Sequence, residues 1–91
     1  MATGEVTDVI FRRWKDRPGP AGVIAIFPAE RLPAGHYGCV APEHPDQHGS
    51  IDYRYNLRRT VRATPEEYRE LKAHLERRGC RLRILARMPA R

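Results

Sequence analysis

The sequence predicts an α+β domain, in which an antiparallel sheet of four or five strands carries one helix packed on a face. The expected order is strand, strand, strand, an optional further strand, helix and final strand. Three features predict this class. A helix-start signal stands at residues 64–67, a continuous apolar run covers residues 23–27, and apolar and basic residues alternate over residues 80–84.

The chain opens with two strands joined by a turn. We expect the first strand over residues 9–14. Residues 16–22 contain two prolines and two glycines, which is typical of a turn. Residues 23–27 are apolar without interruption and end at Pro28, so we expect a central strand that is covered on both faces. The pair therefore predicts a hairpin whose loop is longer than the tightest types.

The middle of the chain is less regular. We expect a third strand over residues 37–41, because Pro42 and Pro45 interrupt the pattern after it. Residues 53–57 alternate again and predict either a short fourth strand or an ordered loop.

A helix over residues 65–78 is the clearest element. Thr64 and Glu67 have the spacing of a capping box, and Gly79 suits the left-handed position that ends a helix. Leu71 and Leu75 lie four residues apart, so we expect both to be buried against the sheet.

The final strand follows directly. Residues 80–84 alternate with a period of two, which places Cys80, Leu82 and Ile84 on one face.

Length and composition predict a single domain over residues 1–91, with an ordered core at about 6–87. The 41% of apolar residues is a globular content, and two cysteines cannot form a disulfide framework. The first residues lack the pattern of a signal peptide, and no apolar run approaches the ~20 residues that cross a bilayer. We therefore expect a soluble, cytoplasmic protein that does not contact a membrane.

Charge is concentrated in the second half of the chain. Residues 1–50 carry five basic and six acidic residues, whereas residues 51–91 carry twelve and five, so the halves have net charges of −1 and +7. Arginine supplies fifteen of the seventeen basic residues. This choice favours bidentate contact with phosphate or carboxylate, although a GC-rich genome would give the same bias.

Histidine and cysteine are clustered in one segment. His36, Cys39, His44 and His48 have gaps of two, four and three residues, close to those of a zinc knuckle. A structural zinc site usually includes two or more thiolates, and this segment has one. We therefore favour no metal and no cofactor, with zinc on Cys39, His44 and His48 as the alternative.

The same segment has a catalytic interpretation. Cys39 would be the nucleophile, with His44 or His48 as its base and Glu43 or Asp46 orienting the imidazole. A buried strand cysteine beside a proline-rich loop predicts a structural role instead. Because phosphate-binding, serine-hydrolase and zinc-protease motifs are all missing from the sequence, we expect no enzyme.

A second group of residues combines tyrosine with arginine. Its members are Tyr53, Arg54, Tyr55, Arg58, Arg59 and Arg62. Aromatic rings can stack on bases while guanidinium groups contact phosphates. The alternative is a solvated edge whose tyrosines pack on the core and whose arginines keep the edge soluble.

Four segments of the chain carry a resemblance to a known family. They are Val9-Ile10-Phe11-Arg12, Ile24-Ala25-Ile26-Phe27-Pro28, Cys39-x4-His44-x3-His48-Gly49 and Ala63-Thr64-Pro65-Glu66-Glu67-Tyr68. Over residues 8–86 the chain resembles a family of small uncharacterised proteins from phages and conjugative elements. The resemblance implies a mobile genetic element as the setting and implies no activity. His36 and the arginine-rich segment at 54–62 depart from the family pattern.

These features together predict a small, non-enzymatic binding protein of mobile-element type. Its expected partner is nucleic acid or a ribonucleoprotein, contacted through the arginine and tyrosine residues. The alternative is a protein that binds and inhibits a host or defence factor. A zinc-binding module and a Cys/His enzyme are the remaining alternatives, and the sequence does not predict the oligomeric state.

Overall fold

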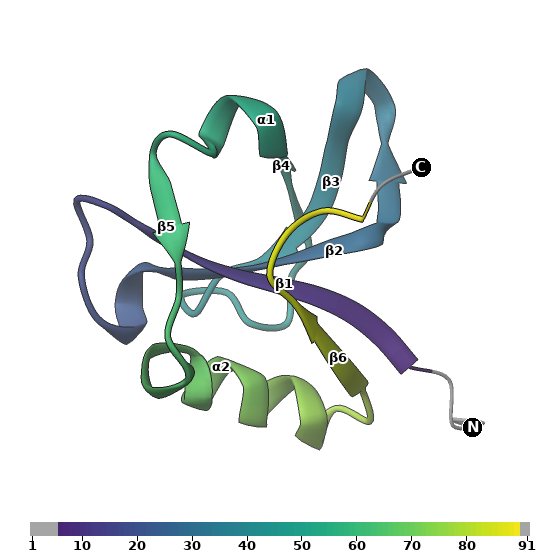
Figure 1. Cartoon of the computed structure of the whole chain (residues 1–91). Coiled ribbons are helices and arrows are strands. Elements are labelled where there is room, and N and C mark those ends of the chain that lie inside the picture. Colours follow the sequence, from purple (N-terminus) through teal and green to yellow (C-terminus); the bar gives the residue numbers. More distant parts are fainter. Residues whose placement is uncertain (1–5, 90–91) are drawn as a thin grey trace.

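The computed structural model describes residues 6–89 of the 91-residue chain, and their elements form a sheet with a helix against it (Figure 1). The elements are β1 (Val6–Trp14), η1 (Pro20–Gly22), β2 (Val23–Leu32), η2 (Pro33–Gly35), β3 (His36–Val40), β4 (Gly49–Asp52), α1 (Tyr53–Asn56), β5 (Thr60–Arg62), α2 (Pro65–Arg77) and β6 (Arg81–Leu85). The predicted α+β class and the single main helix are confirmed.

The predicted hairpin of the first two strands is also confirmed. β1 and β2 pair antiparallel, with Ile10 opposite Ile26, and β2 pairs on its other side with β3. Residues 22–28 are all buried, as expected for a central strand covered on both faces. The turn before β2 ends at Gly22. A glycine is needed at this position, because a Cβ there would overlap the backbone carbonyl of Arg17.

The expected antiparallel sheet of four or five strands is only partly correct, because the sheet of the described residues has six strands and one of them is parallel. Along one path the strand order is β4-β3-β2-β1-β5, and β6 pairs with β1 in parallel. β4 and β5 are too short for their alternation to register in the sequence. Both strands lie on edges of the sheet; β4 has four residues and β5 has three.

The direction of β6 follows from the element before it. β5 runs antiparallel to β1 from Trp14 back to Arg12, and the chain then enters α2. Thirteen helical residues span about 20 Å. This length carries the chain to the start of β1, where it reverses at Gly79, so β6 begins opposite Val6 and runs parallel to β1.

Both ends of α2 form as the sequence predicts. The Thr64 hydroxyl accepts a hydrogen bond from the Glu67 N–H at 3.2 Å, and the Glu67 carboxylate accepts one from the Thr64 N–H at 3.0 Å. Gly79 adopts a φ of 97°, which an L side chain rarely adopts, and its N–H donates to the Glu76 carbonyl. The helix itself ends at Arg77, one residue before the predicted end.

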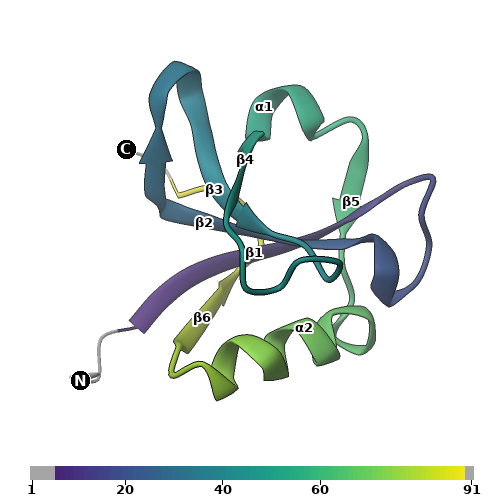
Figure 2. The same cartoon turned by 180° about the vertical axis from the view of Figure 1, so that it is seen from behind.

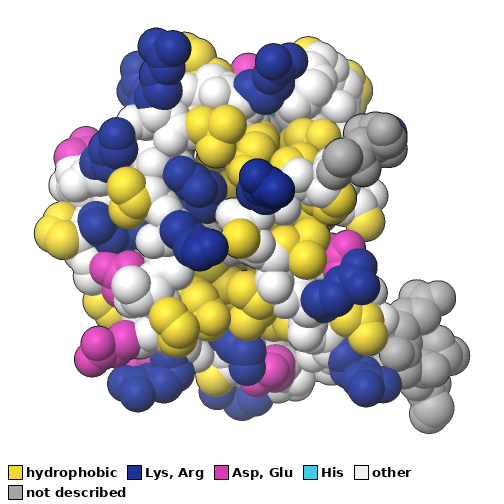
Figure 3. All heavy atoms as spheres, viewed as in Figure 1, with side chains coloured by type: hydrophobic (Ala, Val, Ile, Leu, Met, Phe, Trp, Pro, Cys, Tyr) yellow, Lys and Arg dark blue, Asp and Glu magenta, His cyan; other side chains and the backbone are white. Residues whose placement is uncertain are grey.

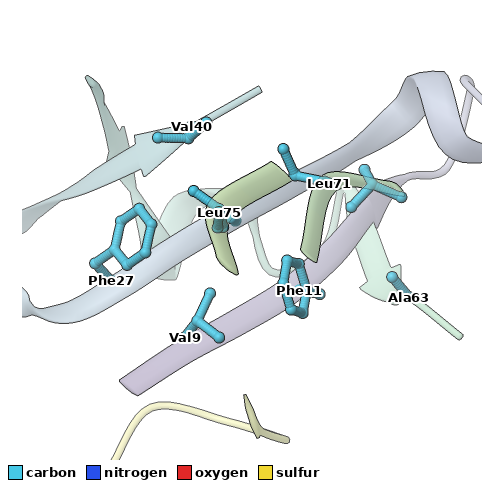
Figure 4. Close-up of a cluster of buried hydrophobic side chains, with 9 residues drawn as sticks. Val9, Phe11, Phe27, Val40, Ala63, Leu71 and Leu75 are labelled. Carbon is cyan, nitrogen blue, oxygen red and sulfur yellow. The ribbon is translucent and has the colours of Figure 1, made fainter. Parts of the chain in front are cut away.

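The sheet is apolar on both faces. On one face α2 covers a cluster that includes Val9, Phe11 and Phe27 from the strands and Leu71 and Leu75 from the helix (Figure 4). Leu71 and Leu75 are each 5% exposed, so the predicted buried face of the helix is confirmed.

The opposite face is covered by smaller elements. Ile10, Ile26, Cys39 and Ile51 form its cluster together with Tyr53. In Figures 1 and 2, α1 lies on the side of the sheet away from α2 and continues directly from β4. The apolar residues of β6 differ in burial. Leu82 packs against the helix-side cluster, whereas Ile84 is 39% exposed.

Within the described residues, neither helix is long and apolar enough to cross a membrane.

Truncating the core beneath α2 should be costly. Leu75→Ala is expected to lower the free energy of unfolding by about 2–5 kcal/mol, because it removes buried methyl groups and leaves a cavity. Urea denaturation measures the change. Leu57→Ala is the control, since that side chain is 39% exposed and should cost less than about 1 kcal/mol. Equal effects of the two substitutions would contradict the assigned core.

Acid should destabilise the protein through its ion pairs. Arg83 donates to both oxygens of Asp8, at 2.7 and 3.0 Å, and these hydrogen bonds hold the pKa of Asp8 below its ordinary value. Because folding lowers this pKa, the ionised carboxylate stabilises the fold above about pH 4, and the contribution is lost as the pH falls further. Glu43 and Asp46 act in the same direction through their own basic partners.

Thermal unfolding between about pH 5 and pH 2 measures this effect. We expect the melting temperature to fall on acidification, and to fall less steeply in Asp8→Asn than in the parent protein. A parent protein that becomes more stable on acidification would contradict the sign of this linkage.

Candidate functional site

The arginine- and tyrosine-rich segment begins as a short helix. The prediction of a strand or loop over residues 53–57 is wrong, because Asp52 caps a helical turn there. Its carboxylate accepts the Tyr55 N–H at 3.0 Å, and its carbonyl accepts the Asn56 side-chain amide at 2.9 Å. Thr60 closes the segment by donating its hydroxyl to the Asn56 carbonyl at 2.9 Å.

The two tyrosines of this segment have different environments. Tyr53 is 7% exposed, its ring meets that of Tyr37 edge-to-face, and its hydroxyl accepts the Met88 N–H at 3.3 Å. Tyr55 is 62% exposed. Tyr53 therefore belongs to the core and has no ring face for a partner, whereas Tyr55 can contact one.

The arginines of the segment are all exposed. We call Arg54, Tyr55, Arg58, Arg59 and Arg62 the arginine surface. The first four line one hollow of about 450 Å³. The Arg59 guanidinium lies 4.9 Å from the centre of the Tyr55 ring and donates to its hydroxyl at 2.9 Å. In the described part of the chain, none of the four arginines of this surface forms an ion pair.

Within residues 6–89, four arginines outside this surface form ion pairs with acidic residues. Arg13 pairs with Glu67, Arg17 with Glu43, Arg78 with Asp46, and Arg83 with Asp8, at 2.7–2.9 Å. These four acidic residues are thus paired away from the arginine surface, whose own arginines have no ion pair among the described residues.

Arg12 is a further member of this region that the sequence did not indicate. It lies opposite Arg62 in the β1–β5 pair, and its guanidinium donates to the Thr60 hydroxyl at 2.7 Å and carbonyl at 2.8 Å. Its bonds fix the start of β5. Arg12 and Arg62 are fifty positions apart in the sequence. Arg12 could therefore have been assigned to this region only if the pairing of β5 with β1 had been predicted.

Figure 3 shows this side of the molecule in the view of Figure 1. Basic side chains lie among and around exposed apolar side chains, and acidic side chains lie towards the margins. The face therefore combines positive charge with apolar surface.

The cysteine and histidine residues are not assembled into one site. Cys39 is 8% exposed and belongs to the cluster on the sheet face away from α2. His48 instead stacks on Phe27, a member of the helix-side cluster, and its Nδ1 lies 2.8 Å from the Glu30 carboxylate. His36 is half-buried at the start of β3, and His44 is exposed in the loop before β4.

The acids of this loop also have other partners. Glu43 accepts from Arg17 at 2.7 Å, and Asp46 lies 3.0 Å from His74 and 2.9 Å from Arg78 on α2. These contacts tie the loop to its neighbours. Among residues 6–89, no three His, Cys, Asp or Glu side chains lie close enough together to hold a metal ion.

The Cys39 thiol is poorly suited to act as a nucleophile. Burial raises its pKa, which keeps it protonated near neutral pH, and the nearby Glu30 carboxylate adds to that effect. No described histidine is hydrogen-bonded to this thiol.

Comparison with protein-family models, with curated proteins and with solved structures gave no match for this chain. Functional inference therefore depends on the geometry of the chain itself.

The two cysteines should differ in reactivity. With iodoacetamide near pH 8, we expect Cys80 to be alkylated well before Cys39, because Cys80 is only partly buried and the pKa of Cys39 is raised. Peptide mapping by mass spectrometry follows each residue separately. Alkylation of Cys39 as fast as that of Cys80 would indicate an accessible thiolate and revive the catalytic interpretation.

Proposed function

We propose that the protein is a non-enzymatic nucleic-acid-binding protein, which contacts single-stranded or structured nucleic acid, free or within a ribonucleoprotein, through the arginine surface. The observation that carries the proposal is an exposed tyrosine that shares one hollow with Arg54, Arg58 and Arg59. Neither these three arginines nor Arg62 forms an ion pair within residues 6–89. Residues 54–62 contain four arginines and no acid, a local charge of +4.

This arrangement suits a polyanion. Like charges held close together repel one another and disfavour the compact state, so the cluster gains from an anionic partner. Phosphates neutralise the guanidinium groups and release counterions, which makes such binding favourable and dependent on salt. Guanidinium groups also contact phosphate oxygens in a bidentate manner.

Tyr55 adds a contact for bases. Its exposed ring can stack on any base, since every base presents a π-face. α1 has only four residues, which is too short to read a groove as recognition helices do. We therefore expect weak binding with little sequence preference.

The second candidate is a protein that binds and inhibits a host or defence factor. Tyr and Arg dominate the energetics of many protein interfaces, and Leu57 and Ile84 add exposed apolar surface. The resemblance to proteins of phages and conjugative elements suits either candidate. A pull-down from lysate with and without nuclease separates them, because capture of one protein that survives nuclease favours the inhibitor.

Salt dependence tests the proposed contact directly. For a labelled single strand, log K should fall linearly with log salt, with a slope of about −0.7 for each phosphate contact. Replacing Arg58, Arg59 and Arg62 together with Ala should flatten this slope by about 1.4–2.1, which corresponds to two or three contacts. Fluorescence anisotropy from low to physiological salt measures the slope.

The matched control removes the same charge elsewhere. Arg17, Arg78 and Arg83 are exposed arginines that already pair with carboxylates, and replacing all three with Ala should leave the slope nearly unchanged. If both triple variants flattened the salt slope equally, the change would follow from the lower net charge of the protein and would not locate the contact at the arginine surface. Absence of any binding at tens of micromolar protein in low salt would overturn the proposal in favour of the inhibitor.

A further inference from the structure

A cavity of about 280 Å³ opens next to the arginine surface, where β5 and β6 separate along the edge of β1. Its lining includes Phe11, Arg62, Ala63, Pro65, Tyr68 and Ala86. In Figure 3, apolar surface is exposed in the region between β5 and β6 of Figure 1.

The strand pairing creates this cavity. β6 pairs with β1 up to Ile10, and β5 pairs with it from Arg12 onward, so neither strand covers Phe11. The Ala63 N–H donates to the Phe11 carbonyl at 3.1 Å as the chain turns away into α2. The opening thus lies where the two strands part along β1.

The walls of the cavity are apolar and aromatic with one cationic side chain. Tyr68 stacks on Phe11, with ring centres 4.3 Å apart and planes 15° from parallel. Phe11 is 2% exposed, so the half-buried Tyr68 is the aromatic side chain that a ligand can contact. Arg62 contributes the guanidinium, and it is also a member of the arginine surface. A ligand that fits this lining has a flat apolar part and a negative charge beside it.

We infer that the cavity receives one unstacked base of a single-stranded nucleic acid whose phosphates run along Arg59 and Arg62. This inference rests on the proposed function. Arg59 lies in the turn directly before β5 and Arg62 is the last residue of β5, so both arginines can contact phosphates of one strand. Unstacked bases of single strands commonly insert against aromatic side chains, whereas a duplex keeps its bases stacked and out of reach.

The test compares two oligonucleotides with equal numbers of phosphates. One is a labelled oligo-thymidine of about a dozen nucleotides, and the other is its abasic counterpart. We expect the parent protein to bind the oligo-thymidine more tightly, because only that strand has bases to fill the cavity and to stack on Tyr55.

A variant that fills the cavity tests whether the difference in affinity between the two strands arises there. Ala86 is exposed and lines the cavity, so Ala86→Leu should fill it without removing charge or core packing. We expect this variant to bind the oligo-thymidine roughly 5- to 150-fold more weakly, the loss of one stacked base. Its affinity for the abasic strand and its salt slope should stay unchanged. Ala29→Leu, at another exposed alanine, is the control and should bind both strands as the parent does.

Each other outcome has a definite meaning. Equal affinity of the parent for both strands would overturn the base cavity together with the Tyr55 stacking contact, and would leave the phosphate contacts of the proposed function standing. A preference for oligo-thymidine that Ala86→Leu does not weaken would overturn the base cavity alone, whereas failure to bind either strand would overturn the proposed function itself. An acidic peptide with a central phenylalanine is the competing probe. Tighter binding of that peptide than of the oligo-thymidine, weakened by Ala86→Leu, would assign the cavity to a protein segment and overturn the inference.

Discussion

The structure depends on β1, which is paired along both edges and buried on both faces at its centre. β2 occupies one edge, and β6 and β5 share the other in succession. Val9, Ile10 and Phe11 are each no more than 2% exposed and supply both apolar clusters. Because two strands divide one edge, they must part at Phe11. That division opens the cavity and brings Arg62 from β5 beside Arg12.

Local signals in the sequence were sufficient for some elements and not for others. The capping residues of α2 and the apolar run of β2 act over a few positions, so both elements could be predicted. β4 and β5 form because β3 and β1 offer them open edges, and such long-range pairing leaves little trace in a short segment. The parallel direction of β6 depends in turn on β5 and on the length of α2, so alternation alone could not reveal it.

The candidate site shows the same limit. The charge of residues 54–62 is a property of composition, and the structure exposes all four arginines there. Tyr53 and Tyr55 look alike in an alternating pattern, but the cap at Asp52 turns one ring inward and the other outward. Cys39 and His48 are close in sequence and lie against opposite faces of the sheet. The four arginines have no ion pair among the described residues, so this segment keeps the positive charge that its composition predicts.

Mapping a single strand on the protein by NMR tests this account most directly. Titration of an unlabelled oligo-thymidine into the ¹⁵N-labelled chain should shift the amide signals of residues 54–62 and of residues 84–86 beside the cavity. The loop at residues 42–48 and the exposed side of α2 should remain unchanged, because each contains more acidic residues than lysines and arginines. Shifts confined to that loop and to α2, with the arginine surface unaffected, would contradict the account.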